Sequence, residues 1–206
     1  MDLTTYAGLQ SAIADWLMRE DLEAQIPAFI TLAEAGFSRR IRSPEMVTRA
    51  DTEISSQYFA GPEDLLEVRR FSLTNLQPAR TVEFMSMEQL VSEQHKWTWR
   101  GHPRYYTLQG RTLQILPAPD DTYTAELVYY AHIPALTEER PVNWLLRNHP
   151  DVYLYGALVE SAPFLKEDER VATWGQLRDD AIRRINEDGQ RAEYSRGPIR
   201  VRAKPL

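Results

Sequence analysis

The stretch HKWTWRGHPRYY, residues 95–106, interleaves aromatic and cationic side chains. Trp97 and Trp99 stand close to Arg100 and Arg104. Such a mixture can stack nucleic-acid bases or sugars. Tryptophan, tyrosine and arginine are also the residues enriched at protein interfaces. The pattern therefore favours a loop whose aromatic residues are partly core or bind a neighbouring subunit or tail partner, with base stacking as the alternative.

Two carboxylate positions could carry acid–base chemistry. Glu160 lies in an apolar segment, and Asp120 adjoins Asp121 in a proline-rich turn. A carboxylate with a raised pKa is a candidate catalytic group, but glycoside hydrolysis needs two carboxyl groups at a defined separation. No second catalytic group is visible near Glu160. We favour a buried glutamate satisfied by a tyrosine or an arginine, and an ordinary turn role for Asp120.

Motifs for metal, phosphate or nucleophile chemistry are missing from the sequence. The four histidines have no metal-ligand spacing, and there is no GxSxG, GxxxxGK[ST] or GxGxxG. Cysteine is absent, which removes disulfides, thiolate nucleophiles and cysteine-based metal sites. The sequence therefore predicts no enzyme activity, no catalytic residue, no cofactor and no bound metal. The histidines are His95, His102, His132 and His149.

The last residues differ in charge from the rest of the chain. The protein has 24 Lys and Arg against 30 Asp and Glu, a net charge of −6, yet YSRGPIRVRAKPL has no carboxylate. Apolar and basic residues alternate in it, which is the period of a strand. A lone strand is unstable in water, so we expect this tail to dock on a partner, with pairing to its own β subdomain and disorder as alternatives. The predicted contact comprises Arg196, Gly197, Pro198, Ile199, Arg200, Val201 and Arg202.

Hydrophobic periodicity sets the order of the elements. Residues 1–43 show the helical period, residues 44–134 mostly the strand period, and residues 135–193 the helical period again. Residues 194–206 form the extended basic tail. We predict an α+β protein that is mainly an α-helical bundle of N- and C-terminal helices, with an inserted antiparallel β subdomain.

Individual elements follow from the same patterns. Residues 150–165 are apolar almost all round, which indicates burial on most sides and the centre of the bundle. Residues 86–94 are expected to form a short helix, and Gly110-Arg111 a tight hairpin. The predicted strands are residues 47–54, 66–73, 80–84, 105–109, 112–116 and 122–132.

Four segments taken together resemble a known family. The sequence resembles the tailed-phage head–tail adaptor, or connector, family and is similar to podovirus tail tubular protein A and to adaptors of gene-transfer particles. The resemblance covers roughly residues 4–202 and rests on the order of the segments and on their amino-acid sequences. The segments are TTYAGLQSAIADWLMREDLEAQIPAFITLAEAGFSRRIR, GPEDLLEVRR, GHPRYYTLQGRTLQILPAPDDTYTAELVYYAHIPAL and NWLLRNHPDVYLYGALVESAPFLKEDERVATW.

The resemblance implies a structural virion protein at the head–tail junction, made in the host bacterial cytoplasm. It implies a ring, usually of twelve copies, that lies beneath the portal protein and docks a downstream nozzle or tail-tube protein. Genomic DNA would pass through the lumen without specific binding, which suits an acidic chain. The basic tail would grip the portal. The sequence has no signal peptide and no transmembrane segment, so we expect no membrane partner.

Two alternatives remain open at the level of the sequence. The first is a nucleic-acid-binding module that uses residues 95–106 and the basic tail, and salt-dependent DNA binding would reveal it. The second is a tail-associated hydrolase that uses Glu160 or Asp120, and a hydrolase assay of Glu160→Gln would test it.

Overall fold

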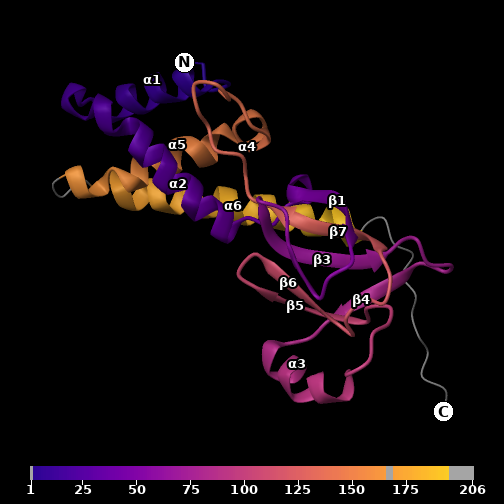
Figure 1. Ribbon diagram of the computed structural model, residues 1–206. Coiled ribbons are helices and arrows are strands. Elements are labelled where there is room, and N and C mark those ends of the chain that lie inside the picture. The colour runs from indigo at the N-terminus through magenta and orange to yellow at the C-terminus, as the bar shows by residue number, and fades with distance from the viewer. Residues whose placement is uncertain (1, 166–168, 195–206) are drawn as a thin grey trace, which may run out of the picture. The chain divides into compact units, whose positions relative to one another are not determined.

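The protein divides into two compact units. A computed structural model describes residues 2–165 and 169–194 (Figure 1). One unit is discontinuous, taking the chain up to Glu45 and from Ile133 onward, and the other is the continuous segment Met46–His132. We call them the helical unit and the β unit, and each is described by itself.

Local sequence signals account for the ends of the helices in the helical unit. The Thr5 side chain accepts a hydrogen bond from the Gly8 amide at the start of the first helix, and Asn143 caps α4 in the same way. Pro150 opens α5 at the first helical position, where its missing N–H costs nothing. The helices are α1 (Tyr6–Leu17), α2 (Ile26–Arg40), α4 (Trp144–Asn148), α5 (Pro150–Glu160) and α6 (Arg170–Tyr194).

Helix α5 lies at the centre of the helical unit, as its all-round apolar sequence predicts. It packs against α1, α2, α4 and α6. Tyr153 and Leu158 are fully buried. Gly156 lies against the Phe37 ring of α2 so closely that a Cβ atom there would be 2.5 Å from Cζ of Phe37. The small residue therefore sets how near α5 approaches α2.

The β unit is a seven-stranded sheet with its own hydrophobic core. The strand order is β1-β7-β3-β4-β5-β6-β2, so β1 and β2 are the edge strands. The register pairs Val47 with Tyr130 and Ile54 with Tyr123 across β1 and β7. The strands are β1 (Val47–Ile54), β2 (Tyr58–Ala60), β3 (Leu65–Leu73), β4 (Arg80–Phe84), β5 (Tyr105–Gln109), β6 (Thr112–Leu116) and β7 (Tyr123–Ala131).

Helix α3 (Met87–Glu93) connects β4 to β5 within the β unit. The Ser86 side chain accepts from the Gln89 amide while the Gln89 side chain accepts from the Ser86 amide, so a capping box starts this helix. Only Leu90 of α3 is buried. Because α3 carries the chain across, β5 runs parallel to β4, with Glu83 paired to Tyr105.

The predicted fold class needs correction. The chain is not mainly an α-helical bundle, because a seven-stranded sheet with a separate core makes up one of its two units. The sheet is mixed rather than antiparallel, since β4 and β5 run parallel. The broader class α+β is compatible with the structure. Strand β2 was missed because three residues are too few to display a period of two.

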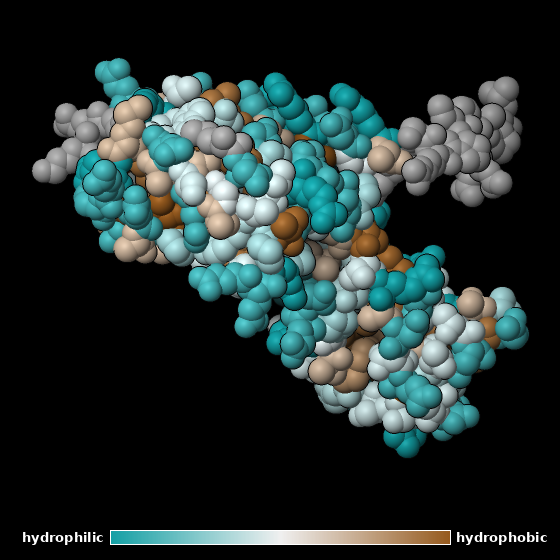
Figure 2. Space-filling view, turned by 90° about the horizontal axis from the view of Figure 1, so that it is seen from above, coloured by the Kyte–Doolittle hydropathy of each residue, from teal (hydrophilic) through white to brown (hydrophobic). Residues whose placement is uncertain are grey.

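Hydrophilic side chains cover most of the face shown in Figure 2, with smaller hydrophobic patches between them. Within residues 2–165 and 169–194, no helix combines the length and the apolar character needed to cross a bilayer.

Candidate interaction surface

The aromatic–basic stretch folds into one cluster of side chains. The Trp97 ring centroid lies 5.5 Å from that of Trp99 and 5.7 Å from that of Tyr105. The Arg104 guanidinium carbon lies 5.7 Å from the Trp97 ring centroid, within cation–π range. Trp97 is half-buried, whereas Trp99 is 46% exposed. Of the four predicted interface residues, Trp97 therefore contacts two others, Trp99 and Arg104.

Arg100 borders a shallow cavity beside this cluster. Its backbone bridges to Ala118, which fixes the strand-like course of the chain at this point. The cavity has a volume of about 540 Å³. Val91 of α3 lines it together with Trp97, Trp99 and Arg100. All four predicted interface residues thus lie at one place in the β unit.

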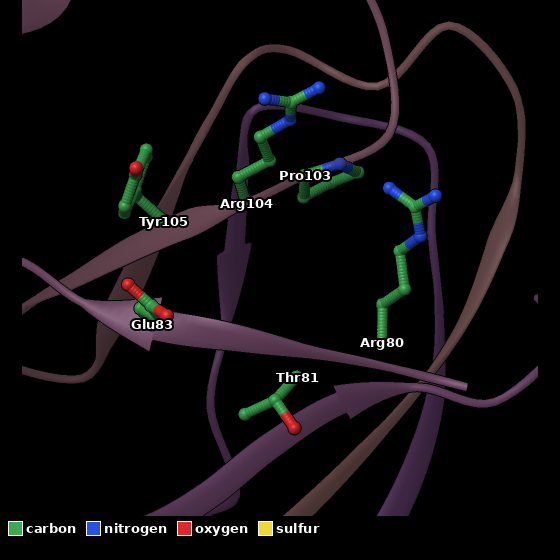
Figure 3. A pocket seen from close by; sticks show the side chains of 6 residues that line it. All are labelled: Arg80, Thr81, Glu83, Pro103, Arg104 and Tyr105. Carbon is green, nitrogen blue, oxygen red and sulfur yellow. The ribbon is translucent and has the colours of Figure 1, made fainter. Parts of the chain in front are cut away.

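A second concavity adjoins the cluster through Arg104. It has a volume of about 400 Å³ and lies between the starts of β4 and β5. Figure 3 shows the Arg80 and Arg104 side chains extending in the same direction, with Pro103 between them. Thr81, Glu83 and Tyr105 complete the lining. Sequence reasoning missed Arg80, because only the parallel pairing of β4 with β5 brings it near Arg104.

His102 holds one of these arginines in place. Burial and the guanidinium groups of Arg80 and Arg104 lower the pKa of His102. The imidazole is therefore neutral at pH 7, and its Nε2 accepts a hydrogen bond from Nη1 of Arg80. This contact orients the Arg80 guanidinium without neutralising its charge.

The charge of these arginines is not balanced locally. Among the described residues, Arg80, Arg100 and Arg104 have no carboxylate within ion-pair distance. Other cations of the β unit do have a carboxylate partner. Glu126 pairs with Arg70 at 2.7 Å and with Arg49 at 3.2 Å. Lys96 pairs with Glu93 at 2.7 Å. The cations of the described β unit that lack a carboxylate partner are therefore gathered around the aromatic cluster. We define the Trp–Arg surface as Trp97, Trp99, Val91, Arg80, Arg100 and Arg104.

Three apolar side chains of β4 and α3, one of them Val91 of the Trp–Arg surface, are exposed. Phe84 is 64% exposed and Val91 is 56% exposed. Met87 lies one turn before Val91 on α3 and is also exposed. Exposed apolar residues that gather in one region, rather than singly, mark interaction sites. The combination of Trp, Met and Arg is that of a protein interface.

A profile of the SU10 adaptor protein family matches residues 4–202. The chain belongs to the SU10 adaptor protein family. No curated protein matches the sequence. Membership indicates a structural role as a phage adaptor that contacts other head or tail proteins of the virion. It also indicates the head–tail junction as the site of action and a protein that is not an enzyme.

The buried glutamate of this SU10 adaptor is Glu34 rather than Glu160. Glu160 is only half-buried at the end of α5. Oε1 of Glu34 accepts hydrogen bonds from the Tyr153 hydroxyl at 2.9 Å and from the Leu136 amide at 2.8 Å. Burial raises the pKa of Glu34, although both hydrogen bonds oppose that effect. The sequence could have indicated the burial of Glu34, because helical spacing places it on the same apolar face as Ile30 and Phe37.

The other acidic candidate is engaged in a turn, as predicted. Oδ1 of Asp120 accepts a hydrogen bond from the Tyr123 hydroxyl at 2.6 Å. That hydrogen bond lowers the pKa of Asp120, which is the wrong direction for a general acid. In the described part of the adaptor, no group of three or more His, Asp or Glu side chains could hold a metal ion.

The predicted tail contact cannot be placed in the adaptor. Its residues lie outside the described ranges, so the contact stays a prediction. They are Arg196, Gly197, Pro198, Ile199, Arg200, Val201 and Arg202.

Proposed function

We propose that this adaptor forms a ring beneath the portal protein of a tailed phage. The ring, usually of twelve copies in the adaptors it resembles, extends the DNA channel and docks a downstream nozzle or tail-tube protein. The Trp–Arg surface carries this proposal, because it leaves cations and apolar side chains available to a protein partner. The kinship with podovirus tail tubular protein A and with gene-transfer-particle adaptors is part of the same proposal.

Charge supports the passage of DNA through the ring. The chain carries a net charge of −6, and each further copy in a ring adds the same amount. Nonspecific DNA binding depends on phosphate contacts with lysine and arginine, so an acidic wall discourages it. The adaptor is made in the host bacterial cytoplasm and then joins the particle.

The basic tail, residues 196–202, is the proposed portal contact. The proposal keeps the predicted division of the chain into residues 1–43, 44–134, 135–193 and 194–206, with the last part acting outside the ring. Alternating apolar and basic residues support addition of this segment to the edge of a partner sheet. Arginines on one side of such a strand suit carboxylates of the partner.

Electron microscopy of the adaptor mixed with portal-bearing capsids tests the proposal. We expect the full chain to add a ring of density beneath the portal. A variant that lacks residues 197–206 should keep its melting temperature but lose attachment. Capsids that gain no density with the full chain would refute the proposed function, whereas attachment of the truncated chain with unchanged affinity would refute only the role of the tail.

A DNA-binding experiment with the same purified protein distinguishes the proposed function from that of a nucleic-acid-binding module. Duplex DNA titrated at increasing salt should show no binding by the full chain. Binding that falls steeply with salt concentration would support the alternative.

A further inference from the structure

The β unit carries a second surface with unbalanced charge. Asp51 and Glu53 are exposed on β1 and point to the same face of the sheet, because alternate residues of a strand share a face. Neither has a cationic partner within the described ranges. Glu126 lies opposite Asp51 on β7 and is shared by Arg49 and Arg70, so these residues together with Asp51 and Glu53 carry two positive and three negative charges. Two carboxylates therefore remain unpaired at an edge strand.

These carboxylates cannot meet the unpaired arginines within one copy. Strands β7 and β3 separate β1 from β4, which begins with Arg80. Three strand spacings amount to about 14 Å between the backbones, and among the described residues no ion pair joins Asp51 or Glu53 to Arg80. In Figure 1, β7 and β3 likewise lie between β1 and β4. Within the described residues, each surface therefore keeps charges that a partner from outside its own copy could pair with.

A ring supplies such a partner by its symmetry. In a cyclic assembly each subunit presents one patch to the preceding copy and a different, complementary patch to the following copy. The adaptor carries two patches of opposite charge on one sheet, which is what a heterologous contact of this kind requires. We propose that the Trp–Arg surface of one copy binds the Asp51–Glu53 face of β1 in the next copy. This inference rests on the ring of the proposed function.

The chemistry of the Trp–Arg surface favours a carboxylate partner over DNA phosphates. Arg100 and Arg104 can each bind a carboxylate with two parallel N–H···O hydrogen bonds. Glu83 lines the same concavity as Arg80 and Arg104, and Asp120 lies close enough to Arg100 to feel its charge. These acidic groups weaken the attraction for a densely charged nucleic-acid backbone more than for one or two carboxylates, because the repulsion grows with the number of negative charges brought near. Trp99 could stack on a base, but the exposed aliphatic Val91 beside it buries its apolar area better against a protein.

Charge reversal in both patches tests the contact. We expect Arg100→Glu with Arg104→Glu to weaken ring formation on portal-bearing capsids about tenfold or more, because like charges then face each other. Asp51→Arg with Glu53→Arg should do the same. The chain that carries all four changes should regain rings, since the pairing is restored with its signs exchanged. Arg111→Glu, at the turn between β5 and β6, is the matched control and should leave ring formation unchanged.

The outcomes distinguish the inference from the function on which it rests. Each variant is first checked for an unchanged thermal melting curve. Wild-type protein that gives no ring refutes the proposed function and, with it, this contact. If wild type forms rings and either charge-reversed variant still forms them, the contact alone is refuted. The contact alone is also refuted if the chain with all four substitutions does not regain rings. Rings that survive while duplex DNA binding is lost in Arg100→Glu with Arg104→Glu would assign these arginines to phosphate.

Discussion

The helical unit and the β unit use their polar side chains differently. In the helical unit, Glu34, Tyr153 and Asn143 point inward and bond one another, and Asn143 also donates to the Pro134 carbonyl at 2.7 Å. In the β unit, the buried polar side chains of the sheet are neutral, and charges such as Arg100 stand at the surface. The first arrangement stabilises the fold, whereas the second leaves charge for a partner.

Two helices show the same contrast in their apolar residues. Helix α5 buries Val152, Tyr153, Leu154, Ala157 and Leu158. Helix α3 buries Leu90 and exposes Met87 and Val91. Both helices are short and apolar in part, so composition alone does not separate them. What separates them is whether the rest of the same unit covers the apolar face, and the uncovered face identifies the interaction surface.

The largest effect is expected where the helical unit is most tightly packed. Leu158→Ala should lower the free energy of unfolding by about 2–5 kcal/mol, because it removes a fully buried side chain and leaves a cavity. Leu154→Ala should act in the same direction. Chemical denaturation measures both. The matched control is Leu32→Ala on α2, which is 53% exposed and should change stability by less than about 0.5 kcal/mol.

A pair of glycines tests the close approach of α5 to α2. Gly156→Ala should cost about 1–3 kcal/mol, since the new methyl group overlaps the buried Phe37 ring. Gly175→Ala on α6 has nothing within 4 Å of the new Cβ atom and should be stabilising by about 0.5–1 kcal/mol. Thermal melts of the two variants should therefore shift in opposite directions. Equal shifts in melting temperature would show that the Phe37 ring moves aside at little energetic cost.

The buried carboxyl of Glu34 predicts a pH dependence for the helical unit. Because its pKa is raised on folding, the native state binds the proton more strongly than the unfolded chain. Its contribution to stability is therefore lost as the pH rises from the ordinary carboxyl range through the raised pKa, and is constant above that. Glu34→Gln keeps an oxygen acceptor for the Leu136 amide but does not titrate. We expect urea denaturation to show that the free energy of unfolding of wild type falls relative to that of Glu34→Gln as the pH rises through this range. A difference between the two proteins that does not change with pH would contradict the assignment.

The smallest effect is expected on the exposed side of α3. Val91→Ser should change the free energy of unfolding by less than about 0.5 kcal/mol, because its side chain is already largely in water. Leu90→Ala, at the neighbouring buried position, should cost about 2–5 kcal/mol. If the two substitutions destabilise equally, the outer face of α3 belongs to the core and not to an interaction surface.

Local patterns predicted the local structure well. The predicted strands at residues 47–54, 80–84, 105–109 and 112–116 coincide with β1, β4, β5 and β6, because alternation is a property of neighbouring residues. The clustering of Trp97, Trp99 and Arg104 was predictable for the same reason. Pairing between distant strands was not, so both the parallel pair β4–β5 and the approach of Arg80 to Arg104 escaped prediction.

Charge partners on the last helix show the same limit. Glu187 and Arg191 are four residues apart on α6, the spacing at which charged side chains of a helix meet, and they form an ion pair at 3.8 Å. Asp179, however, pairs with Arg40 of α2 at 2.9 Å rather than with Arg183. Helical spacing identifies which residues can meet along one helix, but it carries no information about a competing partner on another helix.

The discontinuity of the helical unit bears on the timing of folding during synthesis. Helices α1 and α2 leave the ribosome early, yet their packing partner α5 begins only at Pro150. The intervening β unit is continuous in sequence, so all of its strands are available before α5 exists. Contacts between distant parts of a chain form late because loop closure costs entropy. In pulse-labelled hydrogen exchange we therefore expect the amides of β3 and β7 to become protected before those of α2. The apolar side of α2 stays uncovered in the nascent chain until α5 has been synthesised.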